Sequence, residues 1–157
     1  MAVQNVLILQ SNGTPIFSKD YHSIKESSVI ISGFLTAIDS FAQSIGAGSQ
    51  LKTIETDQFR FIGDQSKKYG IKFILICDKN DDPHQAELLL RSIKKSFLIK
   101  HYKILRSKNP FDDLEKFKSW EANLDRLVNN SELTSFNSLV SETLERLKKI
   151  FKEKVPK

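Results

Sequence analysis

The segment DKNDD at residues 78–82 is the part of this chain that most resembles a metal-binding loop. Closely spaced Asp and Asn oxygens suit Ca²⁺, but an EF-hand loop that begins at Asp78 requires Gly at its sixth position and Glu at its twelfth. Pro83 and Leu89 occupy those positions. Asp82 followed by Pro83 is typical of a helix start, with a capping carboxylate and a proline in the first turn. We therefore interpret the segment as a strand-to-helix turn.

The other residues that could do chemistry do not combine into a site. The segment GAGS at residues 46–49 would cradle a phosphate only if it opened a helix, whereas here it closes a helical pattern. His22, His84 and His101 have no ligand spacing, and Cys77 ends an apolar run without an obvious basic neighbour. The sequence therefore predicts a protein that is not an enzyme and holds no cofactor or metal.

The composition predicts one folded domain with at most a small appendage. A chain of 157 residues with 39% hydrophobic residues can bury a real core. The net charge of +5 arises from 24 basic and 19 acidic residues found in both halves of the chain, which is not the concentrated basic patch typical of nucleic-acid binding. The single Cys excludes an internal disulfide, and the N-terminus lacks the features of a signal peptide. We expect a cytoplasmic protein, with peripheral membrane contact left open.

Five segments have the apolar pattern of strands: residues 6–10, 15–18, 51–55, 58–62 and 71–77. The first and the last are apolar almost throughout, so we expect both to lie inside a sheet and to be buried on both faces. Asn12 and Gly13 suit a type I′ hairpin turn between the first two strands. Residues 64–70 are polar and are predicted to form a loop.

Four segments have a helical period: residues 28–45, 83–105, 111–128 and 133–151. The sequence SKNP at 107–110 and the sequence NNS at 129–131 are expected to break the chain between them. This pattern divides the protein into a domain at residues 1–128 and a basic amphipathic helix at residues 129–157, which either packs on the domain or extends from it.

The first helix is unusual because residues 27–50 contain one charged residue, Asp39, in a chain that is 27% charged. We expect its wide apolar stripe to lie on the sheet; the stripe comprises Ile30, Phe34, Ala37, Ile38, Phe41 and Ile45, joined by Ile31, Leu35 and Ala42. A solvated helix normally carries Glu, Lys and Arg on its outer face, but here that face has small uncharged residues. The pattern predicts that a partner covers the outer face. Asp39 and the many hydroxyl and amide groups argue against a membrane span.

Strands that lie before and after a helix, without strict alternation, favour an α+β fold with an antiparallel sheet. This order resembles that of the longin-domain family. The segment NVLILQSNGTPIFS at residues 5–18 is similar to the opening hairpin of longin proteins. Three further motifs follow in the family's order, namely SF at 40–41, KTI at 52–54 and FRF at 59–61. The resemblance covers residues 3–127 and is greatest to the first longin domain of the Rab exchange factors of vacuolar and lysosomal fusion.

The resemblance implies a longin-like five-stranded antiparallel sheet with one helix on one face and two on the other, plus an extra C-terminal helix. It also implies a non-catalytic scaffold in small-GTPase regulation or membrane trafficking. Such a scaffold pairs with itself or with another longin- or roadblock-like chain, and it can contact a small GTPase.

In longin pairs the first helix and the adjoining edge strand meet their counterparts in the partner. The resemblance therefore implies a partner-binding surface made of Val29, Ser32, Gly33, Thr36, Ser40 and Gln43 on the helix and Leu51, Thr53 and Glu55 on the strand. Small residues permit close approach of a helix, and an unpaired edge offers hydrogen bonds to an incoming strand.

The C-terminal helix suggests an alternative function, because it carries Lys148, Lys149, Lys152 and Lys154. The alternative is a basic adaptor that binds nucleic acid or an acidic membrane surface through its C-terminal helices. The same lysines are also typical of a helix that packs on its domain with a solvated face and a favourable dipole interaction. Nucleic acid is the less favoured partner, because the basic residues are not concentrated over the chain.

Overall fold

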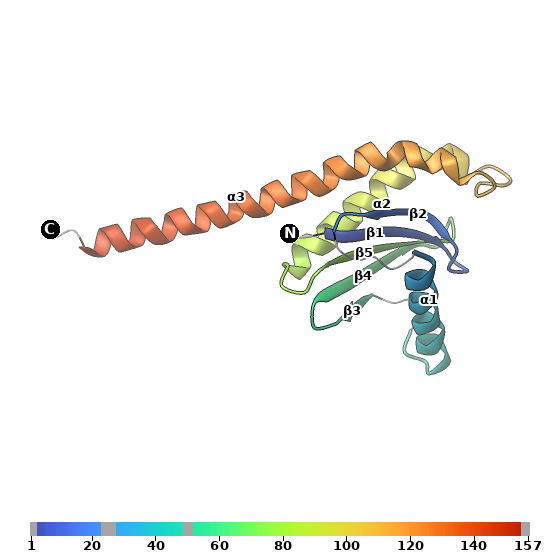
Figure 1. Ribbon diagram of the computed structural model, residues 1–157, viewed down its shortest axis with the longest axis horizontal. Helices are drawn as coiled ribbons and strands as arrows, with labels where there is room; N and C mark the ends of the chain where they lie inside the picture. Colours follow the sequence, from blue (N-terminus) through green and yellow to red (C-terminus); the bar gives the residue numbers. More distant parts are fainter. Residues whose placement is uncertain (1–2, 23–27, 49–51, 155–157) are drawn as a thin grey trace.

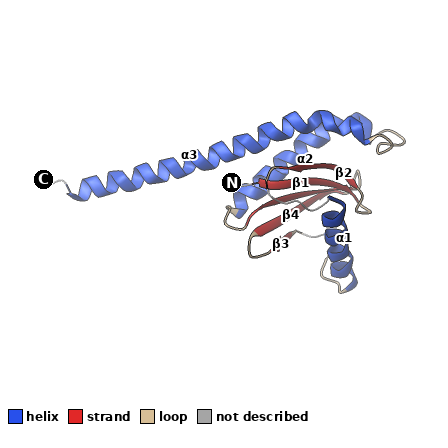
Figure 2. Ribbon diagram, viewed as in Figure 1, coloured by secondary structure: helices blue, strands red, loops and turns tan. Residues whose placement is uncertain are grey.

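A five-stranded antiparallel sheet forms the centre of the fold (Figures 1 and 2). The computed structural model describes residues 3–22, 28–48 and 52–154, with the backbone alone at 132–139, 141, 153 and 154. Its elements in chain order are β1 (Val3–Gln10), β2 (Pro15–Asp20), α1 (Ser28–Ser44), β3 (Thr53–Glu55), β4 (Phe59–Ser66), β5 (Ile71–Asp78), α2 (Pro83–Leu105), the 3-10 helix η1 (Leu114–Trp120) and α3 (Glu121–Lys154).

The strands are arranged in the order β2-β1-β5-β4-β3, so β1 and β5 lie inside the sheet as predicted. Val6 pairs with Leu75 and Leu7 with Ile74, and all four side chains are buried. Successive residues of a strand point to opposite faces, so a strand with covered faces needs apolar residues at every position. This explains the continuous apolar runs of β1 and β5. The two edges of the sheet are β2 and β3.

One face of the sheet is covered by α2, η1 and the first turns of α3, which together form the larger core. The side chain of Asp82 accepts a hydrogen bond from the backbone N–H of His84 at 3.0 Å, which confirms the predicted helix cap. Trp120 lies fully inside this core, with its ring centroid 5.3 Å from Phe17 and 5.2 Å from Phe97. The larger core therefore joins the hairpin to the C-terminal helices.

The opposite face of the sheet carries α1, so one helix lies on one face and the remaining helices lie on the other. The smaller core on this face contains Leu7, Leu9, Ile31, Leu35, Ile74 and Ile76. This arrangement confirms the predicted α+β, longin-like fold.

The hairpin turn differs from the prediction, since among the described residues only glycines have positive φ. A type I′ turn requires positive φ at both central residues, and here Gly13 alone has it, at 89°. The N–H of Gly13 donates to the carbonyl of Gln10 at 2.9 Å, and the N–H of Gln10 donates to the carbonyl of Thr14 at 2.8 Å. The connection is therefore longer than a two-residue loop, and the pairing register shifts between Ile8 and Leu9.

Other boundaries also differ. The helix predicted at 111–128 is the 3-10 helix η1 followed by the start of α3. The predicted loop at 64–70 begins as strand, because Asp64, Gln65 and Ser66 continue to pair with β5. The predicted break at 129–131 is wrong, because α3 is one continuous helix of 34 residues. Asn lowers helix stability by only a few tenths of a kcal/mol more than most residues, and the segment contains no Gly or Pro. Leu124 and Val128, which precede this segment, are buried in the larger core and anchor the helix there.

Candidate partner-binding surface

Most of the apolar stripe of α1 faces outward, which contradicts the prediction for all of its large residues except Ile31, Leu35 and half-buried Ile38. Phe34 and Phe41 are 54% and 64% exposed, whereas Ile31 and Leu35 are buried against the sheet. Figure 1 shows α1 running away from the sheet toward its C-terminal end. The face of α1 that packs on the sheet is therefore not the face that carries the largest apolar side chains of the helix.

The single charge of this segment explains the orientation. Asp39 is 5% exposed, and its Oδ2 lies 2.6 Å from Nζ of Lys72 on β5. Ile31, Leu35 and Asp39 are spaced by four residues, so one face of the helix presents all three to the sheet. A buried carboxylate requires a partner of opposite charge, and Lys72 supplies it from the sheet face that α1 covers.

The hairpin turn makes a second contact with α1. A side chain built on Gly13 would place its Cβ 2.4 Å from the hydroxyl oxygen of Thr36. Thr36 is half-buried at this contact. Gly13 therefore permits both the positive φ of the turn and the close approach of the helix.

The predicted partner residues are distributed over three environments. Those on the exposed part of the surface are Val29, Gly33, Ser40, Gln43, Thr53 and Glu55. Thr36 packs against the hairpin turn, and Leu51 lies outside the described residues. Ser32 is 2% exposed, and its hydroxyl donates to the carbonyl of Val29 at 3.0 Å. Its expected exposure to a partner is therefore wrong.

Edge strand β3 adjoins β4 only. The N–H of Gly63 on β4 donates to the carbonyl of Lys52, and the N–H of Thr56 donates to the carbonyl of Phe59 on β4. Because the bonding direction alternates along a strand, the backbone groups of Thr53 and Glu55 point away from β4. The opposite edge, at β2, contacts α3. Lys19 pairs with Glu121 there, and the hydroxyl of Tyr21, just after β2, donates to Asp125.

We name the exposed apolar stripe of α1 together with β3 the α1–β3 surface; its large apolar residues are Val29, Ile30, Phe34, Phe41 and Ile45. Half-buried Ile54, Phe59 and Phe61 lie on the same face of the sheet, packed against the smaller core. The sequence prediction omitted Ile30, Phe34, Phe41 and Ile45 because it assigned them to the core. Large exposed apolar patches on folded domains mark binding sites for proteins, membranes or ligands, so this surface is the candidate site of the chain.

The His, Cys, Asp and Glu side chains of the described part were candidates for metal binding or for a reactive thiol. Within residues 3–22, 28–48 and 52–154, no group of three His, Cys, Asp or Glu side chains could hold a metal ion. Burial raises the pKa of the Cys77 thiol to about 11, helped by Asp81, so the thiolate that reactive cysteines need does not form near neutral pH.

Arg60 has a structural contact: it donates to the carbonyl of Asp81 at 2.6 Å and thus joins β4 to the turn before α2.

Comparison with known families identifies the chain. A model of the Sybindin-like family matches residues 3–131, which is most of the sequence. The chain belongs to the Sybindin-like family. The match confirms the resemblance to longin-domain proteins, whereas the finer resemblance to Rab exchange factors stays a prediction. A search of curated protein sequences found no significant match to this Sybindin-like chain.

Solved structures share its fold at low sequence identity. The structure of the mammalian SRP receptor matches with a TM-score of 0.57 and 10% identity, covering 85% of this chain and 98% of that one. Myxococcus xanthus MglB matches with a TM-score of 0.50 and 16% identity, covering 68% and 81%. A roadblock/LC7 domain from Streptomyces avermitilis gives a TM-score of 0.46 and 11% identity, covering 60% and 85%. The first two similarities show the fold of this Sybindin-like chain.

Among the described residues, no helix is both long enough and apolar enough to cross a membrane.

Proposed function

We propose that this Sybindin-like chain is a non-catalytic scaffold in small-GTPase regulation or membrane trafficking, and that it acts in the cytoplasm by pairing through the α1–β3 surface. Its partner is a second longin-fold chain, either another copy or a related protein. The observation that carries the proposal is the row of outward-facing Ile30, Phe34, Phe41 and Ile45 beside an open strand edge. Membership of the Sybindin-like family supports the assignment to this class.

The energetics favour a partner that offers the same kind of surface. Complete burial of a large apolar side chain contributes about 1.5–3 kcal/mol, so burying the exposed half of these four residues contributes about 3–6 kcal/mol. Association costs about 4–15 kcal/mol in lost translational and rotational freedom. A longin-fold partner adds an equal apolar contribution from its own first helix, together with hydrogen bonds between the two edge strands. A small polar ligand adds neither.

The experiment measures binding of the immobilised full chain to purified longin-fold chains, itself included, and to small GTPases loaded with GDP or GTP. We expect binding to at least one longin-fold chain. The F34R variant should lose it, because a charge replaces an apolar group at the centre of the exposed stripe. Absence of binding to every longin-fold chain, or full binding by F34R, would contradict the proposal.

Two further variants make the result specific. I99R places the same charge on α2, at a residue that is 61% exposed and lies on the other side of the sheet, and it should bind normally. T53P removes an outward N–H of β3 without removing a bond to β4, so it should weaken binding if the two sheets join at their edges. Equal losses in F34R and I99R would show a general effect of charge.

A further inference from the structure

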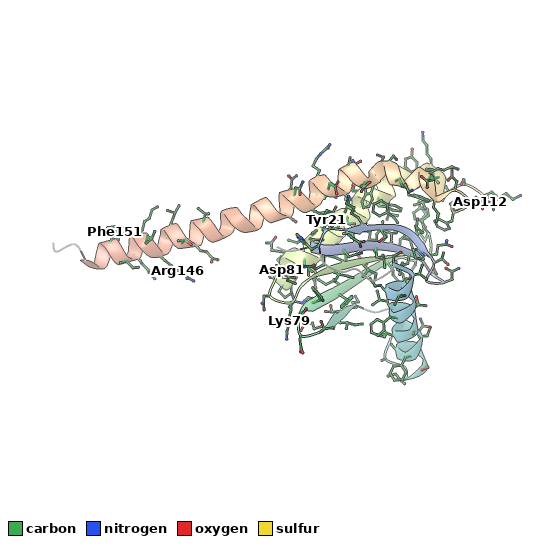
Figure 3. All side chains as sticks on the ribbon, viewed as in Figure 1. Tyr21, Lys79, Asp81, Asp112, Arg146 and Phe151 are labelled. Atoms are coloured by element: carbon green, nitrogen blue, oxygen red, sulfur yellow. The ribbon has the colours of Figure 1, made fainter. Side chains whose placement is uncertain are left out.

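The C-terminal part of α3 forms a second exposed apolar stripe, far from the α1–β3 surface. We name residues 140–154 the α3 extension; its exposed apolar residues are Val140, Leu144, Leu147, Ile150 and Phe151. Phe151 is 68% exposed, although a helix that packs on its domain buries such residues. Figure 3 shows Arg146 and Phe151 on the part of α3 that extends beyond the sheet. The extension also lies outside residues 3–131, which the family model matches.

The net charge of the protein lies at its C-terminal end, although most of the basic residues are spread along the chain. The extension itself, residues 140–154, holds five basic residues and the acidic residues Glu142, Glu145 and Glu153. Residues 146–157 contain six basic residues and one acidic residue, whereas residues 1–145 contain eighteen of each sign. The whole net charge of +5 therefore belongs to the last twelve residues. An even distribution would have placed less than one positive charge there.

The helical period places the charges beside the stripe. Val140, Leu144, Leu147 and Phe151 follow at spacings of four, three and four residues, so they share one face. Lys148 and Lys152 follow one flank of this face, one turn apart. The described side chains between 142 and 152 are all exposed.

We infer that the α3 extension is an amphipathic helix that binds the surface of an anionic lipid bilayer. Its apolar stripe would enter the boundary between headgroups and acyl chains, while the lysine side chains reach the acidic headgroups. Each basic residue near an anionic surface strengthens binding by about fivefold. The extension is amphipathic and does not have the apolarity of a span, which suits a helix lying in the plane of the membrane.

A second copy of the chain is a less suitable occupant of this stripe. Self-pairing would bring together two extensions that each carry five basic and three acidic residues, so net positive charge would meet net positive charge. The stripe of described side chains also spans fewer than two heptads, whereas a coiled coil usually needs three or more. Binding of the α3 extension to a membrane also leaves the α1–β3 surface accessible, because α1 and α3 lie on opposite faces of the sheet (Figure 1).

The test is flotation of the full chain with vesicles of phosphatidylcholine, with or without about 30% phosphatidylserine. The wild-type chain should float with the anionic vesicles and remain unbound with the neutral ones. K148E/K152E should weaken binding by about tenfold or more, and L144S/F151S should abolish it. K95E/K103E changes the net charge equally at exposed positions of α2 and should bind nearly as well as wild type.

Spectroscopy separates insertion from adsorption. Trp120 is buried, so F151W adds an exposed indole whose emission should shift to the blue when anionic vesicles are added. Equal flotation of K148E/K152E and K95E/K103E, or an unshifted F151W spectrum, would overturn the inference. Binding to soluble poly-glutamate without binding to anionic vesicles would overturn it in favour of an acidic protein partner.

Discussion

At the scale of single residues, His101 is notable because an ionisable ring lies inside an aromatic cluster. It is 1% exposed, and its centroid lies 4.7 Å from Phe97 and 5.0 Å from Phe117. Neither ring nitrogen has a hydrogen-bond partner among the described residues. Burial, with a smaller contribution from Lys100, lowers the pKa of His101 from 6.5 to about 4. The folded state therefore holds this imidazole neutral.

The pKa of His101 predicts a loss of stability in acid. Above pH 6.5 the ring is neutral in both the folded and unfolded states, and as the pH falls toward 4 only the unfolded state gains the proton. The free energy of unfolding should decrease by about 3 kcal/mol across this window because of His101. Urea unfolding at a series of pH values should show this decrease in wild type and a smaller one in H101L. Parallel pH profiles for the two proteins would contradict the assignment.

The Asp39–Lys72 pair should behave as a buried ion pair. D39L leaves the ammonium of Lys72 in a largely buried position without its partner, so we expect a loss of about 3 kcal/mol of stability. The double variant D39L/K72M removes both charges and should recover most of that loss. Thermal and urea unfolding of wild type, D39L, K72M and D39L/K72M complete the double-mutant cycle. Additive effects of the two substitutions would show that the pair does not hold α1 to the sheet.

Asp82 and Asp39 mark what the sequence could and could not predict. The sequence predicts Asp82 as a helix cap because a cap is a local feature, set by Asp followed by Pro and a helical pattern. Asp39 gave no such signal, because its partner Lys72 is 33 residues away and belongs to a strand. The ion pair became visible only when the fold brought α1 and β5 together.

At the scale of elements, the contact between the β1–β2 turn and α1 gives a third prediction. G13A would force a side chain into a backbone with φ of 89° and within 2.4 Å of the Thr36 hydroxyl. Strain of this kind costs about 1–3 kcal/mol, so the melting temperature should fall. The double variant G13A/T36A removes the clash but keeps the strained backbone, so it should recover only part of the loss. Full recovery would assign the whole effect to the clash.

The order of the elements was predictable, but the face of α1 that the sheet covers was not. Continuous apolar runs identified β1 and β5 as interior strands, and the 3.6-residue period identified α2. The same period in α1 identified an apolar stripe, but it did not say whether Phe34 and Phe41 meet the domain's own sheet or a partner. That choice depends on Asp39 and Gly13, whose contacts are not local in sequence.

At the scale of the whole molecule, the domain should be independent of the α3 extension. The described side chains from 142 to 152 are exposed, so deletion of residues 140–157 removes few contacts with the core. We expect the shortened protein to keep the wild-type melting temperature within about 2 °C. It should also keep binding to longin-fold chains and lose flotation with anionic vesicles. A large drop in melting temperature would show that the extension packs on the domain.

The arrangement of the molecule places two exposed apolar surfaces on opposite faces of one sheet (Figure 1). The α1–β3 surface is nearly uncharged, apart from Glu55 paired with Arg60, and it suits a protein partner. The α3 extension has five basic and three acidic residues, with the basic ones gathered from Arg146 onward, and it suits an acidic surface. A scaffold with this layout can hold a longin-fold partner while it rests on a membrane.

The central claim, that the outward apolar face of α1 pairs with another longin-fold chain, is tested most directly by sedimentation velocity. The wild-type chain and the I99R and F34R variants would be measured alone and mixed with a longin-fold chain. We expect a two-chain species for wild type and I99R and a monomer for F34R, with the same melting temperature for all three. A monomeric wild type in every mixture, or a two-chain species that persists in F34R, would contradict the claim.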